Sequence, residues 1–138
     1  MPLEYRFGND LDLEKAIELY RESTLGERRP IDDRLIVEAM LKHANLVVTA
    51  WDAERLVGIS RSLTDFAYVA YLADLAVHID YQNQGIGKRL IGMTRERLGP
   101  RSQIVLLAAP AAADYYGKIG FSHNSRAWIL KAADDFSY

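Results

Sequence analysis

The spacing of apolar residues along the chain predicts several helices. Apolar side chains recur at three- and four-residue intervals over residues 13–20 and 35–43, which places them on one face of a helix in each segment. An aspartate precedes both segments and can cap each helix. Two later helices are expected at 87–98, which Gly99 and Pro100 end, and at 112–119.

Short apolar runs between these helices predict strands. Residues 46–51 and 56–60 flank a polar segment, as the two arms of a hairpin do. The other expected strands are 3–6, 67–79, 104–109, 121–123 and 127–130. No repeat, low-complexity stretch or linker interrupts the series, so we expect one domain over residues 1–138.

The composition is that of a globular protein without thiol chemistry. The 138 residues are 49% hydrophobic and 26% charged and include no cysteine, which excludes disulfides, a cysteine nucleophile and a zinc–thiolate site. The three histidines lie far apart in the sequence, and we expect no metal site. The formal net charge is −2 without a basic block, so nucleic acid is not an expected partner.

The hydrophobic pattern also argues against a membrane protein. The longest uncharged apolar run, residues 104–113, covers about half of a membrane span and contains Pro110. The first residues lack the apolar core of a signal peptide. We therefore expect a cytoplasmic protein that does not bind a membrane.

The apolar strand at 67–79 runs into a glycine turn that a helix follows directly. Glycines let a ligand approach the backbone closely, and the start of the helix directs unpaired N–H groups and the positive end of its dipole at the turn. This arrangement predicts a site for a phosphate-bearing ligand. The residues of the expected site are Gln82, Asn83, Gln84, Gly85, Ile86, Gly87 and Lys88.

Two other phosphate-binding motifs fit this turn poorly. A P-loop would place a hydroxyl residue after the lysine, but Arg89 stands there and a Mg²⁺ ion would lack its ligand. A dinucleotide fingerprint needs a third glycine where Leu90 stands. A nucleotide-binding module that uses the G-x-G turn alone is a further alternative.

Residues 82–87 resemble the [RQ]-x-x-G-x-[GA] segment of the GNAT superfamily, the acyl-CoA-dependent N-acyltransferases. In that family the turn holds the pyrophosphate of coenzyme A. Residues 112–121, AADYYGKIGF, resemble a second family segment, A-x-x-[FY]-Y-x-x-x-G-F. The two matches occur in the family's order, and the resemblance covers residues 69–121.

The resemblance implies an α/β (α+β) fold. Its central sheet is mixed and mostly antiparallel, splayed between the fourth and fifth strands and flanked by about four helices. Backbone groups of Leu75, Ala76 and Val77 would pair with the pantetheine arm of acetyl-CoA. Tyr116 would protonate the departing thiolate, since a phenol with a reference pKa of about 10 suits that task.

The general base is left open by the resemblance. Many members carry Glu directly before the aspartate of an E-D-L-x-V strand, but this chain has Ala73 before Asp74. Strand alternation places Tyr71 and Ala73 on one face and Asp74 on the other, so Asp74 would not replace that glutamate, although His78 could pair with it. The alternatives are Tyr71, a chain of waters, or a weakly basic acceptor such as an aromatic amine.

These observations predict an N-acetyltransferase that moves an acetyl group from acetyl-CoA to a primary amine in a ternary complex. The acceptor would be a small molecule or a peptide or protein amine, selected by residues 21–34, 68–71 and 123–126. A catalytically weak acyl-CoA-binding sensor is the alternative, because position 73 lacks the carboxylate. The C-terminal strands would present an open sheet edge, which favours a possible homodimer.

Overall fold

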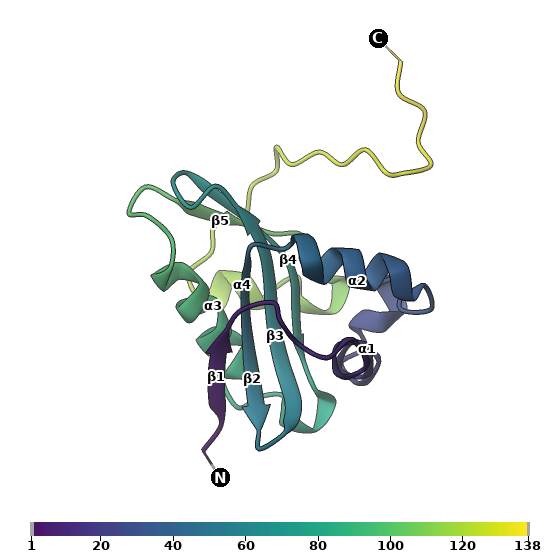
Figure 1. The fold of residues 1–138 in the computed structure, drawn as a ribbon. Helices are drawn as coiled ribbons and strands as arrows, with labels where there is room; N and C mark the ends of the chain where they lie inside the picture. Colours follow the sequence, from purple (N-terminus) through teal and green to yellow (C-terminus); the bar gives the residue numbers. More distant parts are fainter. Residues whose placement is uncertain (1, 138) are drawn as a thin grey trace. The chain divides into compact units, whose positions relative to one another are not determined.

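A five-stranded sheet organises the first part of the chain. In the computed structural model, which describes residues 2–137, the chain forms two compact units, Met1–Leu107 and Ala108–Tyr138. The sheet belongs to the first unit and has the strand order β1-β2-β3-β4-β5 (Figure 1). Its strands are β1 (Glu4–Phe7), β2 (Leu46–Asp52), β3 (Arg55–Thr64), β4 (Val69–Val77) and β5 (Gln103–Val105).

Helices cover both faces of this sheet. Helices α1 (Leu13–Glu22) and α2 (Arg34–His43) lie on one face and α3 (Ile86–Glu96) on the other (Figure 1). The expected caps are confirmed, because Asp12 and Asp33 each accept a backbone N–H from the first turn of the helix that follows. Two short 3₁₀ turns, η1 (Leu25–Arg28) and η2 (Ile79–Tyr81), follow α1 and β4.

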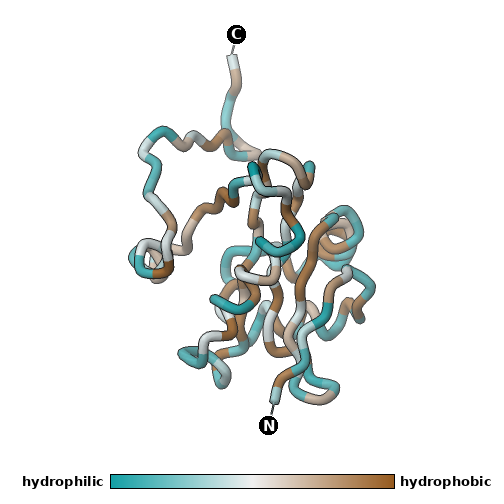
Figure 2. Tube along the Cα trace, turned by 90° about the vertical axis from the view of Figure 1, so that its left-hand side faces the viewer, coloured by the Kyte–Doolittle hydropathy of each residue, from teal (hydrophilic) through white to brown (hydrophobic). Residues whose placement is uncertain are grey.

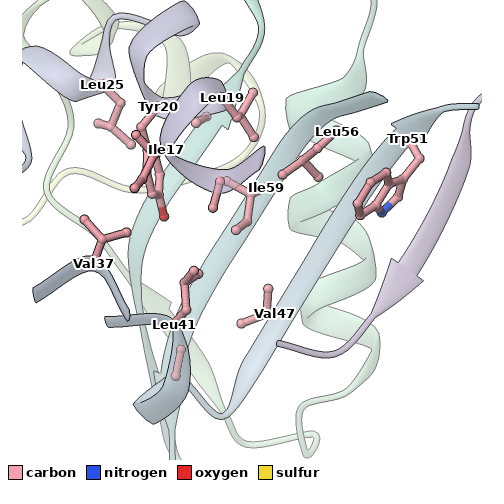
Figure 3. Packing of buried hydrophobic residues seen from close by; sticks show 13 residues of the cluster. Ile17, Leu19, Tyr20, Leu25, Val37, Leu41, Val47, Trp51, Leu56 and Ile59 are labelled. Carbon is pink, nitrogen blue, oxygen red and sulfur yellow. The ribbon is translucent and has the colours of Figure 1, made fainter. Parts of the chain in front are cut away.

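The core follows from strand alternation. Val47 and Trp51 of β2 pack toward α1 and α2, whereas Val48 and Ala50 pack toward α3. Figure 3 shows the first cluster, in which apolar side chains of both helices meet those of the sheet. Figure 2 shows hydrophobic stretches of the Cα trace between bends that are mostly hydrophilic. The sheet is therefore buried on both faces.

Gly58 of β3 lets α3 approach the sheet closely. A Cβ atom at this position would lie 3.1 Å from side-chain atoms of both Ile86 and Leu90, and 3.3 Å from the Cβ of Ala50. These distances are tighter than ordinary packing contacts, which start near 3.5 Å. The glycine therefore fixes how deeply the first turns of α3 sit against β3.

The sheet opens between β4 and β5, as the resemblance implied. All other neighbouring strands are antiparallel, but β4 and β5 run parallel and pair only over Val69–Tyr71 and Gln103–Val105. The rest of β4 continues to Val77 beside β3 alone. The expected fifth strand at 104–109 is thus shorter in the structure, because residues beyond Val105 no longer have β4 as a partner.

The second unit contains a helical turn rather than the expected pair of strands. It comprises η3 (Pro110–Ala112) and α4 (Tyr115–Lys118). Gly120 has a φ of +111° and follows the helix, and the N–H of Phe121 donates to the carbonyl of Tyr116 at 3.0 Å, the pattern of a glycine C-cap.

The predicted strands at 121–123 and 127–130 are wrong. Residues 122–137 contain no strand in the structure, and Trp128 is 94% exposed. A strand needs the backbone of a neighbour to satisfy its N–H and C=O groups, and apolar composition alone does not supply one. In the first unit, β3 extends to Thr64, beyond the predicted end at residue 60, because β2 and β4 both pair with it.

Candidate active site

The open edge of β4 presents backbone groups to a potential ligand. The N–H of His78 donates to the carbonyl of Val57 at 2.8 Å, and Ala76 is in register with Ile59. Because hydrogen-bonded pairs alternate in an antiparallel ladder, the backbone of Ala76 faces β3, whereas the N–H and C=O groups of Leu75 and Val77 face the open edge. An extended ligand could therefore pair with Leu75 and Val77.

The glycine turn begins directly where this edge ends. The side-chain amide of Gln82 donates to the carbonyl of Val77 at 3.0 Å. Asn83 and Gly85 both have positive φ angles, 64° and 83°, which let the chain turn tightly before α3. We call residues 82–88, from this amide to the first turn of α3, the cradle.

The first turn of α3 leaves backbone donors for an anion. The N–H of Arg89 donates to the carbonyl of Gly85 at 3.0 Å and is the first to bond within the helix. The N–H groups of Ile86, Gly87 and Lys88 therefore precede the intrahelical ladder. Gly85 contributes no side-chain cap. These three donors and the helix dipole favour a phosphate at this point.

Packing of the first turns of α3 against the sheet fixes the position of the cradle. Ile86 and Leu90 are buried against the sheet, at 3% and 0% exposure, while the residues of the turn itself are exposed. The guanidinium of Arg89 lies 5.1 Å from the centre of the Tyr5 ring, a cation–π arrangement that directs it to β1. The side chain of Lys88 is exposed and can meet an anion.

A buried ionic cluster lies beside the open edge, on the face of α1 and α2. Asp74 of β4 is 1% exposed, and Arg61 of β3 donates to its Oδ2 at 2.5 Å. Tyr20 of α1 donates to the same oxygen at 2.9 Å. Arg29, which follows η1, donates to Oδ1 at 2.6 Å. We call these four residues the Asp74 cluster; it connects α1, the α1–α2 loop, β3 and β4.

The cluster sets the ionisation of its members. Burial alone would raise the pKa of Asp74, but hydrogen bonds and charges from Arg61 and Arg29 outweigh it and hold this pKa below its ordinary value. Burial and the neighbouring Asp74 charge raise the pKa of Tyr20 far above that of a free phenol. Asp74 is therefore a poor base and Tyr20 a poor acid.

The side chains of β4 do not alternate strictly at Ala73, so the prediction that Tyr71 and Asp74 lie on opposite faces is wrong. Asp74 is opposite Arg61 and Leu72 is opposite Ser62, so Ala73 forms a bulge with no residue of β3 opposite. Tyr71, opposite Leu63, therefore lies on the same face as Asp74. Asp74 is excluded as a base by its three donors, not by its orientation.

His78 has partners other than Asp74. Its Nδ1 accepts the N–H of Asp80 at 3.1 Å, which caps η2. Its Nε2 lies 2.9 Å from the guanidinium of Arg55 and 4.0 Å from the carboxylate of Glu22. His78 thus connects the segment between β4 and the cradle to β3 and α1 through these contacts.

The predicted site residues fall into two groups. Leu75, Ala76, Val77 and the cradle lie in the first unit, where the open edge leads into the glycine turn. Tyr116 lies in α4 of the second unit, half-buried, with its ring in edge-to-face contact with both Tyr115 and Phe121. Its catalytic role is therefore a proposal that rests on the sequence resemblance.

The two arginines of the Asp74 cluster were not predicted from the sequence. A carboxylate inside an apolar strand requires cationic or hydrogen-bonding partners when it is buried, so Asp74 itself was the available signal. Nothing in the spacing identifies Arg29 and Arg61 as those partners, because one lies in a charged loop and the other in the distant strand β3.

Within residues 2–137, no cluster of three or more His, Asp or Glu side chains could hold a metal ion. None of the helices described is long and apolar enough to cross a membrane.

Comparison with known proteins identifies the family of the chain. A family model described as an acetyltransferase (GNAT) domain matches residues 27–128. The chain belongs to the GNAT acetyltransferase family, whose general reaction is acetyl-CoA-dependent N-acetylation. The family and the fold inferred from the sequence are thereby confirmed.

Three individual relatives share 30% or less sequence identity with this chain. The chain is 30% identical over 118 residues to an uncharacterized N-acetyltransferase, ycf52, of Porphyra purpurea; the match covers 78% of this chain and 66% of that protein. A GNAT-family acetyltransferase from Streptococcus pneumoniae superimposes with a TM-score of 0.74 at 22% identity, covering 94% of this chain and 99% of that one. An aminoglycoside N-acetyltransferase solved with coenzyme A gives 0.72 at 18% identity, covering 96% of each chain.

Proposed function

We propose that the chain is an N-acetyltransferase that transfers the acetyl group of acetyl-CoA directly to a primary amine. The observation that carries this proposal is the continuity of the open edge and the cradle, which the hydrogen bond from Gln82 to Val77 joins. A thioester on an extended arm could pair along the edge while its pyrophosphate occupies the cradle. The coenzyme A complex of the aminoglycoside N-acetyltransferase with a similar fold supports this assignment.

The pantetheine arm would extend β4 as an added strand. Leu75 and Val77 supply backbone groups at the open edge, and the backbone of Ala76 is committed to β3. An N–H at this edge can hydrogen-bond the thioester carbonyl and stabilise the oxyanion that forms on attack. The side chains of Leu75 and Val77 pack toward α3, so packing and pairing use different atoms.

Tyr116 would return a proton to the coenzyme. After the amine attacks the thioester carbon, the carbon–sulfur bond breaks and the thiolate leaves with the electron pair. The Tyr116 hydroxyl would donate its proton to this sulfur, and water would restore it. The single-domain interpretation of residues 1–138 is part of the same proposal.

The acceptor amine would approach from the face that carries the Asp74 cluster. Arg29 brings the α1–α2 loop to β4 there, so residues 21–34 and 68–71 are the expected walls. The acceptor is a small-molecule, peptide or protein amine. An amine-panel assay with acetyl-CoA that follows thiol release tests this function; release with at least one amine supports it, and release with none contradicts it.

A catalytically weak acyl-CoA sensor is the second candidate, favoured by the absence of a carboxylate at Ala73. The sensor would bind acetyl-CoA without amine-dependent thiol release, so the same assay combined with calorimetry separates the two.

Cellular location and assembly are two further parts of the proposal. We propose a cytoplasmic protein that forms a homodimer through its exposed C-terminal segment, where Trp128, Ile129 and Leu130 are 94%, 59% and 59% exposed. Apolar exposure of this kind favours contact with another chain. Sedimentation at high concentration tests the assembly, and a purely monomeric species would contradict it.

A further inference from the structure

Arg29 places a cation at the start of the open edge. Its Nε donates to Asp74 at 2.6 Å and its Nη2 to the carbonyl of Ala73 at 2.9 Å. Ala73 is the second residue after Tyr71, where pairing with β5 ends. The guanidinium therefore lies where an acceptor amine would meet a thioester held along the edge.

The Asp74 cluster carries more positive than negative charge. It contains two guanidinium groups, on Arg29 and Arg61, but one carboxylate. The remaining member, Tyr20, keeps its proton and is neutral. The carbonyl of Arg28 accepts from the Nη1 of Arg29, and Tyr71 lies on the same face of β4. The region around Arg29 also carries the carboxylates of Glu22, Glu27, Asp32 and Asp33, but among the described residues only Asp74 forms an ion pair with the Arg29 guanidinium. The cluster thus has a net charge of about +1, with the Arg29 side chain 24% exposed and so accessible to solvent and substrate.

The amine must lose a proton before it can attack, because only its neutral form has a free electron pair. Asp74 cannot accept that proton readily, since three donors occupy its oxygens. A neighbouring positive charge, however, disfavours the protonated ammonium form. At a distance of roughly 8 Å and an effective dielectric constant of about 20, one unit charge shifts an amine pKa by about 1.5 units.

We propose that the net positive charge of the Asp74 cluster, which Arg29 places beside the open edge, disfavours the ammonium form of the acceptor and so promotes its loss of a proton. The inference rests on the proposed acetyltransferase function. The ammonium proton passes to water, the neutral nitrogen forms a bond to the thioester carbon, and the carbon–sulfur bond breaks as the thiolate departs. Arg29 is a positioning and electrostatic residue in this step and takes no proton. The enzyme consequently prefers weakly basic amines over strongly basic ones and polyamines.

The first test uses the wild-type protein and needs no variant. The best acceptor of an amine panel is compared with its β,β-difluorinated analogue, which has nearly the same shape and a much less basic amine. The pH profile of kcat reports ionisation in the ternary complex. For each of the two acceptors we expect the acid limb at least one pH unit below that amine's own pKa in solution; a limb less than one unit below, at or above the solution value overturns the inference.

The second test replaces Arg29 itself. In Arg29→Gln the acid limb should move up by about one pH unit, whereas Arg29→Lys, which keeps the charge, should restore the wild-type limb at least in part. Arg28→Gln removes a neighbouring charge whose side chain lies outside the cluster and should leave the limb in place. A merely structural role would lower activity without moving the limb.

The outcomes separate this inference from the proposed function. An active wild type whose limb is identical in Arg29→Gln and Arg28→Gln overturns the inference alone. A wild type that binds coenzyme A but acetylates no amine overturns the proposed function and the inference with it. If Arg29→Gln does not fold, the wild-type profile with the two acceptors still decides.

Discussion

The side chain of Gln82 donates a 3.0 Å hydrogen bond to the main-chain carbonyl of Val77. This bond fixes the first residue of the cradle to the last residue of the open edge. In Gln82→Ala the turn loses this bond, and we expect coenzyme A to bind about 3- to 10-fold more weakly, consistent with one hydrogen bond of about 1 kcal/mol. Isothermal titration calorimetry measures the change.

The control for this substitution is Gln84→Ala. Gln84 is exposed in the same turn, and the proposal uses only its backbone, so coenzyme affinity should stay near that of the wild type. Equal losses in both variants would show that Gln82 has no special part in positioning the cradle.

The close approach of α3 to Gly58 predicts that a larger residue at this position lowers the free energy of unfolding and displaces the first turn of α3. Gly58→Ala puts a methyl group against Ile86 and Leu90 at 3.1 Å, so α3 must shift or the side chains must rearrange. Overpacking of this kind costs about 1–3 kcal/mol, which urea denaturation should detect. Gly92→Ala is the matched control, because a Cβ atom at Gly92 on α3 meets no atom within 4 Å; it should be neutral or stabilising.

In the described part of the chain, Asp74 is the only carboxylate paired with Arg61, which is buried, and with Arg29, which is partly exposed, so its removal should be costly. Asp74→Asn leaves both guanidinium groups without a counter-charge, and the free energy of unfolding should fall by about 3–5 kcal/mol at pH 7. Tyr20→Phe removes one hydrogen bond to the same carboxylate and should cost about 1 kcal/mol. Comparable values for the two variants would contradict the assigned importance of the ion pairs.

The pH dependence of stability provides a second view of Asp74. Because its pKa is lower in the folded than in the unfolded state, the unfolded state binds the proton first as the pH falls. The contribution of Asp74 is present above its ordinary pKa of about 4 and is lost as the pH falls through the folded value. Urea denaturation between pH 7 and pH 2 should therefore show a smaller acid loss in Asp74→Asn than in the wild type.

Tyr116 carries the proposed proton transfer to sulfur. Tyr116→Phe keeps the ring and its contact with Phe121, so folding and coenzyme affinity should change little, while kcat should fall by about 10²- to 10⁴-fold. Tyr115→Phe, the adjacent tyrosine, should behave like the wild type. If Tyr115→Phe is the slow variant instead, the catalytic assignment moves by one residue.

Local chemistry made most of the first unit predictable from sequence. Apolar spacing and the aspartate caps located α1 and α2, because both signals act within one or two turns of helix. The glycine turn after β4 was equally local, since positive φ angles at Asn83 and Gly85 reflect residue types that tolerate them. The family segment then supplied a strand order that periodicity does not determine.

Features that depend on distant partners were not predictable in this way. The bulge at Ala73 arises from the register between β3 and β4, and it reverses the face inferred for Tyr71. Arg29 and Asp74 are joined only when the α1–α2 loop folds over β4. The segments at 121–123 and 127–130 have strand-like composition, yet neither forms a strand in the structure.

The most direct test of the account is coenzyme A binding to the cradle. Gly85→Val, at a φ of 83°, and Gly87→Val, in the first turn of α3, both place a branched side chain where the backbone should meet phosphate. Gly92→Val, later in the same helix, is the control. By calorimetry, the wild type and Gly92→Val should bind coenzyme A in the micromolar range, and the two cradle variants should lose binding while folded. Full affinity in both cradle variants, or binding of NAD but not coenzyme A by the wild type, would contradict the account.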